Sequence, residues 1–195
     1  FLPFALNLLC RLDEVLKELA HFTCRIDSFI QGLQFRHESF RFDTFEGFPS
    51  VDKADCQPGS SNPSLHQGGF ASQPDTYREL QECIGAFDDN RFLNQFDKIE
   101  LVKGDAVQTI PAYVQTNAHL LVSVLFMDFD IYEPTKVALE QLLPRMPKGS
   151  IIAFDEINNS YWKGETTAML EVLQDLNRYR VQKFPFDPNI AYIQL

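Results

Sequence analysis

The sequence predicts an α/β domain with a mostly parallel sheet. Two runs of apolar residues, 120–127 and 150–154, are typical of strands that are buried on both faces. A helical pattern follows each run, at about 134–143 and at 166–178. Strands that alternate with helices are typical of parallel α/β sheets. The length of 195 residues fits a single domain, 1–195, with a full core.

The first part of the chain adds a helix, a strand and a long loop. Leucines recur at helical spacing through residues 2–20, which predicts an amphipathic N-terminal helix at 1–20. Residues 39–43 alternate between polar and apolar side chains and predict a strand. Residues 50–75 are rich in Ser, Pro, Gly, Asn and Gln. Loops of this length in compact domains tend to be functional, so we expect a mobile loop at the active site.

The remaining elements complete the alternation. Helices are expected at 76–87 and 107–117, with a short strand at 99–102 between them. The C-terminal segments 180–186 and 189–195 predict two strands that form an antiparallel hairpin around Asp187-Pro188.

The composition argues against several classes of function. The formal net charge is -10 and the sequence has no run of Lys or Arg, so we expect no nucleic-acid partner, which would need a clustered basic surface. We expect no membrane partner either, because no apolar run reaches the length of about 18 residues that a membrane span needs. The four cysteines are scattered without a CxxC pair, which indicates reduced thiols and a cytoplasmic location.

Acidic residues stand where four of the predicted strands end. One such acid alone would be read as a helix N-cap. In open α/β sheets, however, ligands bind beyond the carboxyl ends of the strands, so acids at the ends of four strands indicate a binding site. These acids are Asp43, Asp105, Asp128 with Asp130, and Asp155 with Glu156.

Asp128 and Asp155 are the most informative of these acids. One helical crossover separates their strands, so we expect the strands to be neighbours, roughly 5 Å apart. The two carboxylates would repel each other unless a hard divalent cation such as Mg²⁺ lay between them. Strand alternation would direct Asp130 to the same side as Asp128, where it could remove a proton from a substrate hydroxyl. Asp43 and Asp105 would face a nucleotide, toward its ribose and its adenine.

Four segments together resemble one family of enzymes. They are Phe42–Pro49, Lys103–Asp105, Met127–Thr135 and Ile152–Glu156. In this order and spacing they are similar to the macrocin, mycinamicin and novobiocin sugar O-methyltransferases, over about residues 40–195. The resemblance implies a Rossmann-like sheet, S-adenosylmethionine and Mg²⁺ as cofactors, and methylation of a hydroxyl on a deoxysugar or a sugar-bearing small molecule.

The resemblance also implies roles for single residues. Asp128, Asp155 and Glu156 correspond to the metal ligands of the family, although the family usually has Asp at the last position. Asp130 corresponds to a proposed catalytic base. Asp43 corresponds to a contact with the cofactor ribose, and Asp105 to a contact on the adenine side. The loop at 50–75 corresponds to a region that closes over the active site.

The sequence departs from the family upstream of Asp43. A strand and a Gly-rich turn that lets the backbone approach the methionine moiety should stand there. Gly32 is the only glycine between residues 1 and 46, and residues 21–39 are too few for these elements and a helix. The first strand is therefore expected to be absent or rebuilt. Either the cofactor site is degenerate, or the chain derives from an altered or truncated gene. The initial Phe fits a fragment or a processed product.

Other functions fit parts of the pattern. A catalytically inactive homologue would act as a binding or assembly protein, and the leucine-rich helix at 1–20 could mediate self-association. A metal-dependent glycosyltransferase would explain the Asp-x-Asp of Asp128 and Asp130 but not Asp155 with Glu156. A haloacid-dehalogenase-type phosphatase fits poorly, because Tyr132 stands where that motif has Thr or Val.

Overall fold

The computed structural model describes residues 39–56, 62–90, 94–183 and 189–195. The predicted helix at 1–20 and the place of the family's first strand and Gly-rich turn lie outside these residues. The unit described below is Ser39–Leu195.

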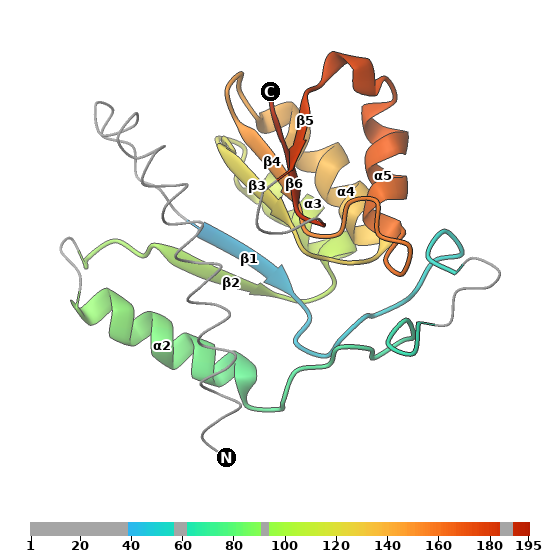
Figure 1. Cartoon of the computed structure of the whole chain (residues 1–195). Helices are drawn as coiled ribbons and strands as arrows, with labels where there is room; N and C mark the ends of the chain where they lie inside the picture. Colours follow the sequence, from blue (N-terminus) through green and yellow to red (C-terminus); the bar gives the residue numbers. More distant parts are fainter. Residues whose placement is uncertain (1–38, 57–61, 91–93, 184–188) are drawn as a thin grey trace. The chain divides into compact units, whose positions relative to one another are not determined.

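The described strands form two sheets (Figure 1). In the first, β1 and β2 are parallel. The second has the order β3-β4-β6-β5, in which β3 and β4 are parallel and β6 runs antiparallel to both of its neighbours. The predicted α/β architecture, with parallel strands and a C-terminal antiparallel pair, is therefore confirmed. The strands are β1 Ser39–Asp43, β2 Ile99–Lys103, β3 Val124–Met127, β4 Ile151–Phe154, β5 Val181–Lys183 and β6 Ala191–Gln194.

The two parallel pairs are not joined in the way that one continuous sheet would require. Within the described ranges, no strand hydrogen-bonds β1 to β3, so the sheet that the sequence predicts as one is described as two. The segment in which the family's first strand would stand precedes β1 and is not described.

Four α-helices and two short 3₁₀ helices connect the described strands. They follow the predicted pattern, with shifts of a few residues at their ends. The helix predicted at about 134–143 begins two residues earlier, so that Pro134 is the third residue of α4. The helix predicted at 166–178 ends earlier, because Gln174 has a positive φ of 55° and a 3₁₀ turn follows. The helices are α2 Thr76–Asn90, α3 Ala106–Thr116, α4 Tyr132–Leu142, η1 Leu143–Arg145, α5 Gly164–Leu173 and η2 Leu176–Arg178.

The two apolar runs differ in burial. All four residues of β4 are buried, as a central strand requires, and β4 lies between β3 and β6. In contrast, the run 120–127 forms a strand only at its end, and three residues of β3 are partly exposed. The prediction of burial on both faces is thus confirmed for β4 and wrong for β3, because β3 is an edge strand of the described four-stranded sheet.

The core lies between the second sheet and helices α3, α4 and α5. Figure 1 shows α4 and α5 side by side, and these two helices pack against each other. Each fully buried apolar side chain of this core contributes about 1.5–3 kcal/mol. This packing holds β3 and β4 rigidly, and with them the loops that leave their carboxyl ends. The largest fully buried apolar side chains are Ile110, Met127, Leu139, Ile152, Phe154 and Ile193.

Candidate active site

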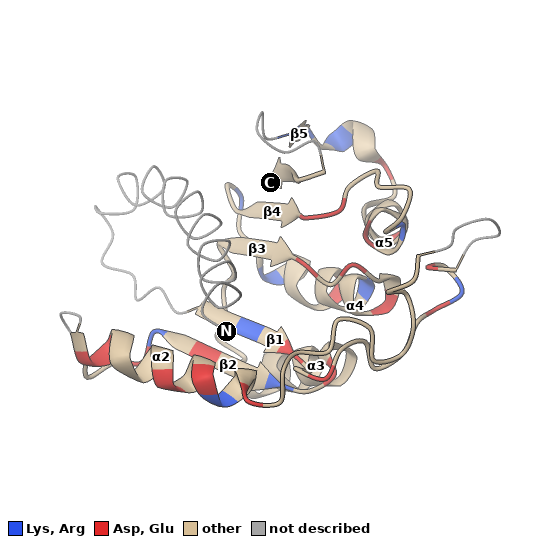
Figure 2. Cartoon of the chain, turned by 60° about the horizontal axis from the view of Figure 1, so that its bottom comes forward, with Lys and Arg blue, Asp and Glu red and all other residues tan. Residues whose placement is uncertain are grey.

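Asp128 and Asp155 leave neighbouring parallel strands at matching positions. Met127 and Phe154, the last residues of β3 and β4, are paired, and the Asp155 N–H donates to the Met127 C=O at 3.0 Å. The two acids that follow these strands therefore start side by side, as the sequence predicted. Figure 2 shows acidic residues directly after the tips of β3 and β4.

The electrostatics of Asp128 reflect this proximity. Its side chain reaches solvent, but the walls of a concave site remove much of the water around it. This desolvation and, next, the negative charge of Asp155 raise the pKa of Asp128 to about 6. A cation near both carboxylates would relieve the repulsion between them.

Asp130 lies on a strained turn rather than on a strand. Because β3 ends at Met127, the alternation that was expected to aim Asp130 does not extend to it. Its backbone has a positive φ of 61°, and the Ile131 N–H donates to the Phe129 C=O across it at 2.7 Å. Such conformations cost about 1–3 kcal/mol in residues other than Gly and are concentrated at functional sites. Desolvation and then the charge of Asp128 raise the pKa of Asp130 to about 7.

Asp43 and Asp105 follow the other parallel pair. Asp43 ends β1, and its Oδ1 accepts from the Phe45 N–H at 2.8 Å. Asp105 is the N-cap of α3 and accepts from the Val107 N–H at 3.0 Å through Oδ1. The N-cap interpretation thus holds for Asp105. Each carboxylate can still accept further hydrogen bonds, because an ionised carboxyl group has about four acceptor positions.

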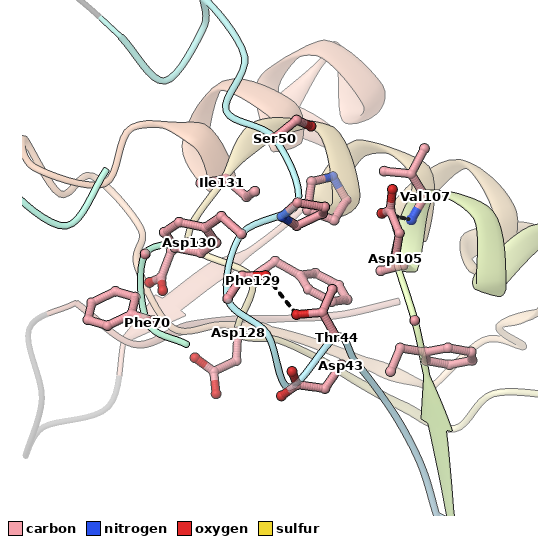
Figure 3. A pocket seen from close by; sticks show the side chains of 18 of the residues that line it. Asp43, Thr44, Ser50, Phe70, Asp105, Val107, Asp128, Phe129, Asp130 and Ile131 are labelled. Carbon is pink, nitrogen blue, oxygen red and sulfur yellow. Dashed lines mark hydrogen bonds between the residues drawn. The ribbon is translucent and has the colours of Figure 1, made fainter. Parts of the chain in front are cut away.

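One pocket brings four of the predicted site residues together (Figure 3). Its cavity volume is about 150 Å³. Its walls come from the turn after β1, the segment around Gly69, the start of α3 and the loop after β3. Predicted site residues in its lining are Asp43, Asp105, Asp128 and Asp130.

Asp155 and Glu156 are not in this lining. The Asn159 side-chain amide donates to Glu156 Oε2, which turns this carboxylate toward the loop after β4. No three His, Cys, Asp or Glu side chains within the described part of the chain are arranged so that together they could hold a metal ion. Asp128 and Asp155 are close enough for their charges to interact, and Glu156 acts on Asp128 less strongly.

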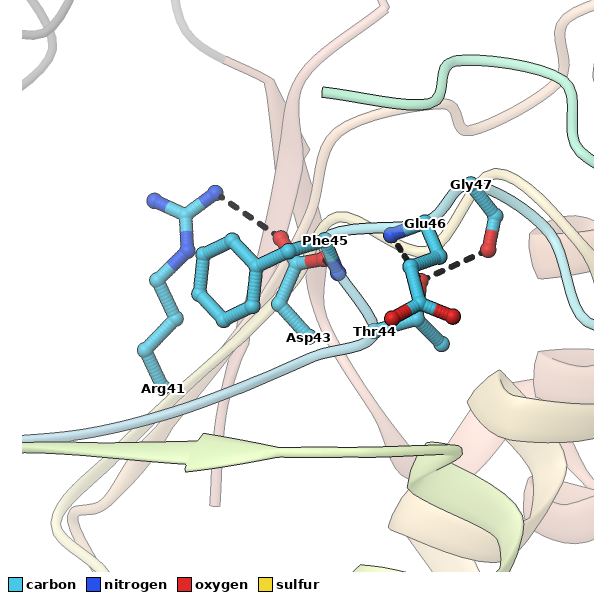
Figure 4. A network of polar contacts seen from close by, with 6 residues as sticks. All are labelled: Arg41, Asp43, Thr44, Phe45, Glu46 and Gly47. Carbon is cyan, nitrogen blue, oxygen red and sulfur yellow. Dashed lines mark hydrogen bonds and ion pairs between the residues drawn. The ribbon is translucent and has the colours of Figure 1, made fainter. Parts of the chain in front are cut away.

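The turn after β1 shapes one wall of the pocket (Figure 4). The Thr44 hydroxyl donates to the Gly47 C=O at 2.6 Å and accepts from the Glu46 N–H at 3.1 Å. Gly47 has a φ of 81°, and a Cβ there would lie 2.4 Å from the Gly69 carbonyl oxygen. Only glycine therefore permits this turn to approach Gly69 so closely.

The loop at 50–75 is attached to α4 by a residue that the sequence did not single out. Asp55 is 3% exposed; its Oδ1 accepts from the Tyr132 N–H at 2.8 Å and its Oδ2 from the Asp52 N–H at 3.0 Å. Because Ile131 provides no side-chain cap, Asp55 acts as the N-cap of α4 from a distant part of the chain.

Aromatic rings flank the same loop. The Trp162 ring lies 6.0 Å from that of Phe48 and 5.4 Å from that of Phe70, measured between centroids. Phe48 and Phe70 line the pocket, and Phe70 is 60% exposed. Trp162 and its neighbour Tyr161 fit either a sugar-stacking wall or an ordinary surface aromatic pair by residue type, and Tyr161 is 64% exposed.

Glu165 is a second functional candidate that sequence reasoning missed. It is fully buried, and its two oxygens accept from the Phe129 N–H at 3.3 Å and the Glu156 N–H at 3.1 Å. Burial raises its pKa to about 8, while the hydrogen bond from the Glu156 backbone opposes the rise. The only local signal was an acid in the first turn of a helix, a common surface feature.

In the described ranges, the longest apolar helical stretches fall short of what crossing a lipid bilayer requires.

Comparison with known proteins identifies the relatives of this chain. A scan against protein-family models and a search of curated proteins match nothing. Among solved structures, the calicheamicin methyltransferase CalS11 is 36% identical, with 80% of this chain and 60% of that chain covered and a TM-score of 0.74. A second structure of CalS11, described as a TDP-rhamnose 3'-O-methyltransferase without ligand, gives 31% identity, coverages of 80% and 58%, and a TM-score of 0.63.

The O-methyltransferase NovP shares the fold, at 21% identity and a TM-score of 0.58, with 87% of this chain and 64% of that chain covered. The chain spans about 60% of the length of CalS11. The described strands have the class I methyltransferase arrangement, and this chain is similar in sequence and fold to the sugar O-methyltransferase CalS11, at 36% and 31% identity to its two structures.

Proposed function

We propose that this chain is an S-adenosylmethionine-dependent O-methyltransferase that methylates a sugar hydroxyl on a small molecule with the help of a divalent metal. The observation that carries the proposal is the set of strand-end acids around one pocket, with Asp128 and Asp155 at matching ends of β3 and β4. The 36% identity to a calicheamicin methyltransferase supports the reaction type.

The cofactor is proposed to bind between the ends of β1 and β2 and the acids after β3. Asp43 would accept hydrogen bonds from the ribose hydroxyls, and Asp105 would lie on the adenine side. Both acids line the pocket and follow paired parallel strands. Gly104 stands directly before Asp105 with a φ of 140°, and a Cβ there would lie 2.9 Å from the Thr109 Cγ2.

The donors present suit Mg²⁺, which is usually held by one or two carboxylates together with several waters. Asp128 and Asp155 are the proposed ligands, because their mutual repulsion favours a bound cation. Glu156 is a weaker candidate, since Asn159 holds its carboxylate. The bound metal would supply the positive charge that makes a substrate hydroxyl more acidic.

Asp130 is the proposed base. Asp130 would accept the proton of the substrate hydroxyl, and bound S-adenosylmethionine would supply the methyl group that this hydroxyl oxygen takes up, with S-adenosylhomocysteine as the other product. A pKa of about 7 suits this role, because a base is most efficient when its pKa is near the working pH. The left-handed turn presents its carboxylate to the pocket (Figure 3).

The acceptor is proposed to rest against Phe48, Phe70 and Trp162. The apolar face of a sugar ring packs well on aromatic rings, and Phe70 offers a large exposed ring at the pocket. The acidic net charge favours a small-molecule acceptor over nucleic acid. We also propose a cytoplasmic location, because Cys56 and Cys83 are exposed free thiols.

A second candidate is a binding or assembly homologue without catalysis. The observation that favours it is the lack of glycine, other than Gly32, between residues 1 and 46, where the family's cofactor turn would stand. The two candidates differ in one property. An enzyme binds S-adenosylhomocysteine, and an inert homologue does not.

Calorimetry of the full chain tests the binding of the cofactor and the binding of the metal. Binding of S-adenosylhomocysteine supports the enzyme, and its absence favours the inert homologue. Asp128→Asn should abolish metal-dependent methyl transfer and weaken Mn²⁺ binding at least about tenfold, with a nearly unchanged unfolding temperature. Asp97→Asn removes the same charge from an exposed position before β2 and serves as the control. Wild-type Mn²⁺ affinity in the Asp128→Asn variant would show that the metal assignment is wrong.

A further inference from the structure

We propose that Glu165 is a positioning residue that holds the ends of β3 and β4 in the arrangement that metal binding and proton removal need. The inference rests on the proposed function and extends it to a residue outside the pocket lining.

Glu165 joins the two loops that carry the proposed metal and base residues. Its Oε1 accepts from the Phe129 N–H at 3.3 Å, and its Oε2 accepts from the Glu156 N–H at 3.1 Å. Phe129 stands between Asp128 and Asp130, and Glu156 directly follows Asp155. One carboxylate thus accepts hydrogen bonds from the backbones of the loop after β3 and the loop after β4, which are called the two acidic loops below.

The chemistry of this position favours a carboxylate over an amide. Two N–H donors approach from the loops after β3 and β4, so the position needs two acceptors. Glutamine offers only one oxygen and would direct its NH₂ at the other donor. Burial of a carboxylate costs several kcal/mol unless it is compensated. The two hydrogen bonds and the N-terminal end of α5, where Glu165 is the second residue, provide compensation.

The loop after β3 needs such support. Asp130 sits in the left-handed region, and a neighbouring hydrogen bond of 2.7 Å closes the turn around it. A strained turn persists only when its surroundings hold it in place. The bond from the Phe129 N–H to Glu165 is one step before Asp130 in the chain and fixes the direction in which the turn leaves β3.

The first turn of α5 also supports the loop after β4 by a hydrogen bond. The Thr166 Oγ1 accepts from the Asn158 N–H at 2.8 Å, and Asn158 also has a positive φ of 60°. Gly164 lets this end of the helix approach closely, because a Cβ there would lie 2.4 Å from the Tyr132 nitrogen at the start of α4. Glu165 therefore stands on a rigid element that contacts both loops.

If the Glu165 carboxylate only stabilised the fold, its replacement would change the free energy of unfolding and nothing else. One that positions Asp128 and Asp155 should affect metal affinity and the rate of the chemical step more than cofactor binding. Loss of such outer partners of metal ligands typically costs about 10–100-fold in metal affinity or activity.

The test compares Glu165→Gln with Glu171→Gln in the full chain. Glu171 lies on the same helix, is half exposed and pairs with Lys136. The Glu171→Gln variant therefore removes one charge without removing a hydrogen bond to the loop after β3 or the loop after β4. Mn²⁺ and S-adenosylhomocysteine binding are measured by calorimetry well below the unfolding temperature. We expect Glu165→Gln to weaken Mn²⁺ binding about 10–100-fold, with cofactor affinity nearly unchanged. Glu171→Gln should leave both affinities at the wild-type level.

The other outcomes separate the inference from the proposed function. If wild type binds Mn²⁺ and folded Glu165→Gln binds it equally well, Glu165 is a structural residue and the inference is overturned alone. If wild type binds no Mn²⁺, the metal part of the proposed function fails and the inference fails with it. Should the Gln variant not fold, Glu165→Asp keeps the charge but is too short to accept from both N–H groups, and it should show the same loss of metal affinity. Failure of both variants to fold would overturn the inference.

Discussion

Gly164→Ala provides a sharp test of how the two acidic loops are held. The added Cβ would lie 2.2 Å from Asp55 Oδ1, 2.4 Å from the Tyr132 nitrogen and 2.6 Å from the Ile131 carbonyl carbon. Two of these three atoms are backbone, so a rotamer change cannot relieve the contact. The start of α5 must move away from the start of α4, or the bond from the Tyr132 N–H to Asp55 must break.

The expected magnitude follows from these contacts. Overpacking of this kind costs about 1–3 kcal/mol, and loss of an N-cap bond adds about 0.5–2 kcal/mol. For a domain of this size, each kcal/mol lowers the unfolding temperature by about 2–4 °C. Gly164→Ala should therefore unfold roughly 6–12 °C below wild type for a loss of about 3 kcal/mol.

Gly85→Ala is the matched control. Gly85 lies within α2, and a Cβ there would meet no atom within 4 Å. Alanine is the better helix former by about 1 kcal/mol, so this variant should be as stable as wild type or slightly more stable. Thermal unfolding followed by circular dichroism measures both variants. An unfolding temperature for Gly164→Ala within about 1 °C of wild type would refute the close packing of α5 on α4.

Two further predictions concern charge and the loop after β1. Desolvation raises the pKa of Asp128 to about 6 and that of Asp130 to about 7, so the folded metal-free protein binds protons more tightly than the unfolded chain. Its unfolding temperature should therefore rise as the pH falls from about 8 to about 5, and Asp130→Asn should flatten this dependence; an equal slope in both proteins would contradict the assignment. Asp55→Ala should cost about 1–3 kcal/mol in urea unfolding, because it leaves the Tyr132 N–H at the start of α4 without its acceptor. The exposed Asp52→Ala is its control, and an equal, small effect of both variants would contradict the role of Asp55 as a cap.

Local pattern was sufficient for much of the fold. Apolar runs predicted β3 and β4, and helical spacing predicted the helices. A strand that is buried as a whole needs a continuous apolar run, and a helix that buries one face needs apolar residues at helical spacing. The same runs placed Asp128 and Asp155 at adjacent strand ends, and their register in the structure agrees. Where an element ends was less predictable: β3 covers only the last half of the run 120–127, since the pairing with β4 decides which residues join the sheet.

The sequence by itself determined the α/β class and the strand-end acids that line the pocket. Each of these depends on residue types at short spacing, which the chain displays directly. The tertiary structure alone decided the roles of Asp55 and Glu165, because each accepts a hydrogen bond from a backbone N–H that is far away along the chain, at 77 and 36 residues respectively. A buried carboxylate and an exposed one look alike in sequence, and only folding brings the backbone donors that distinguish them.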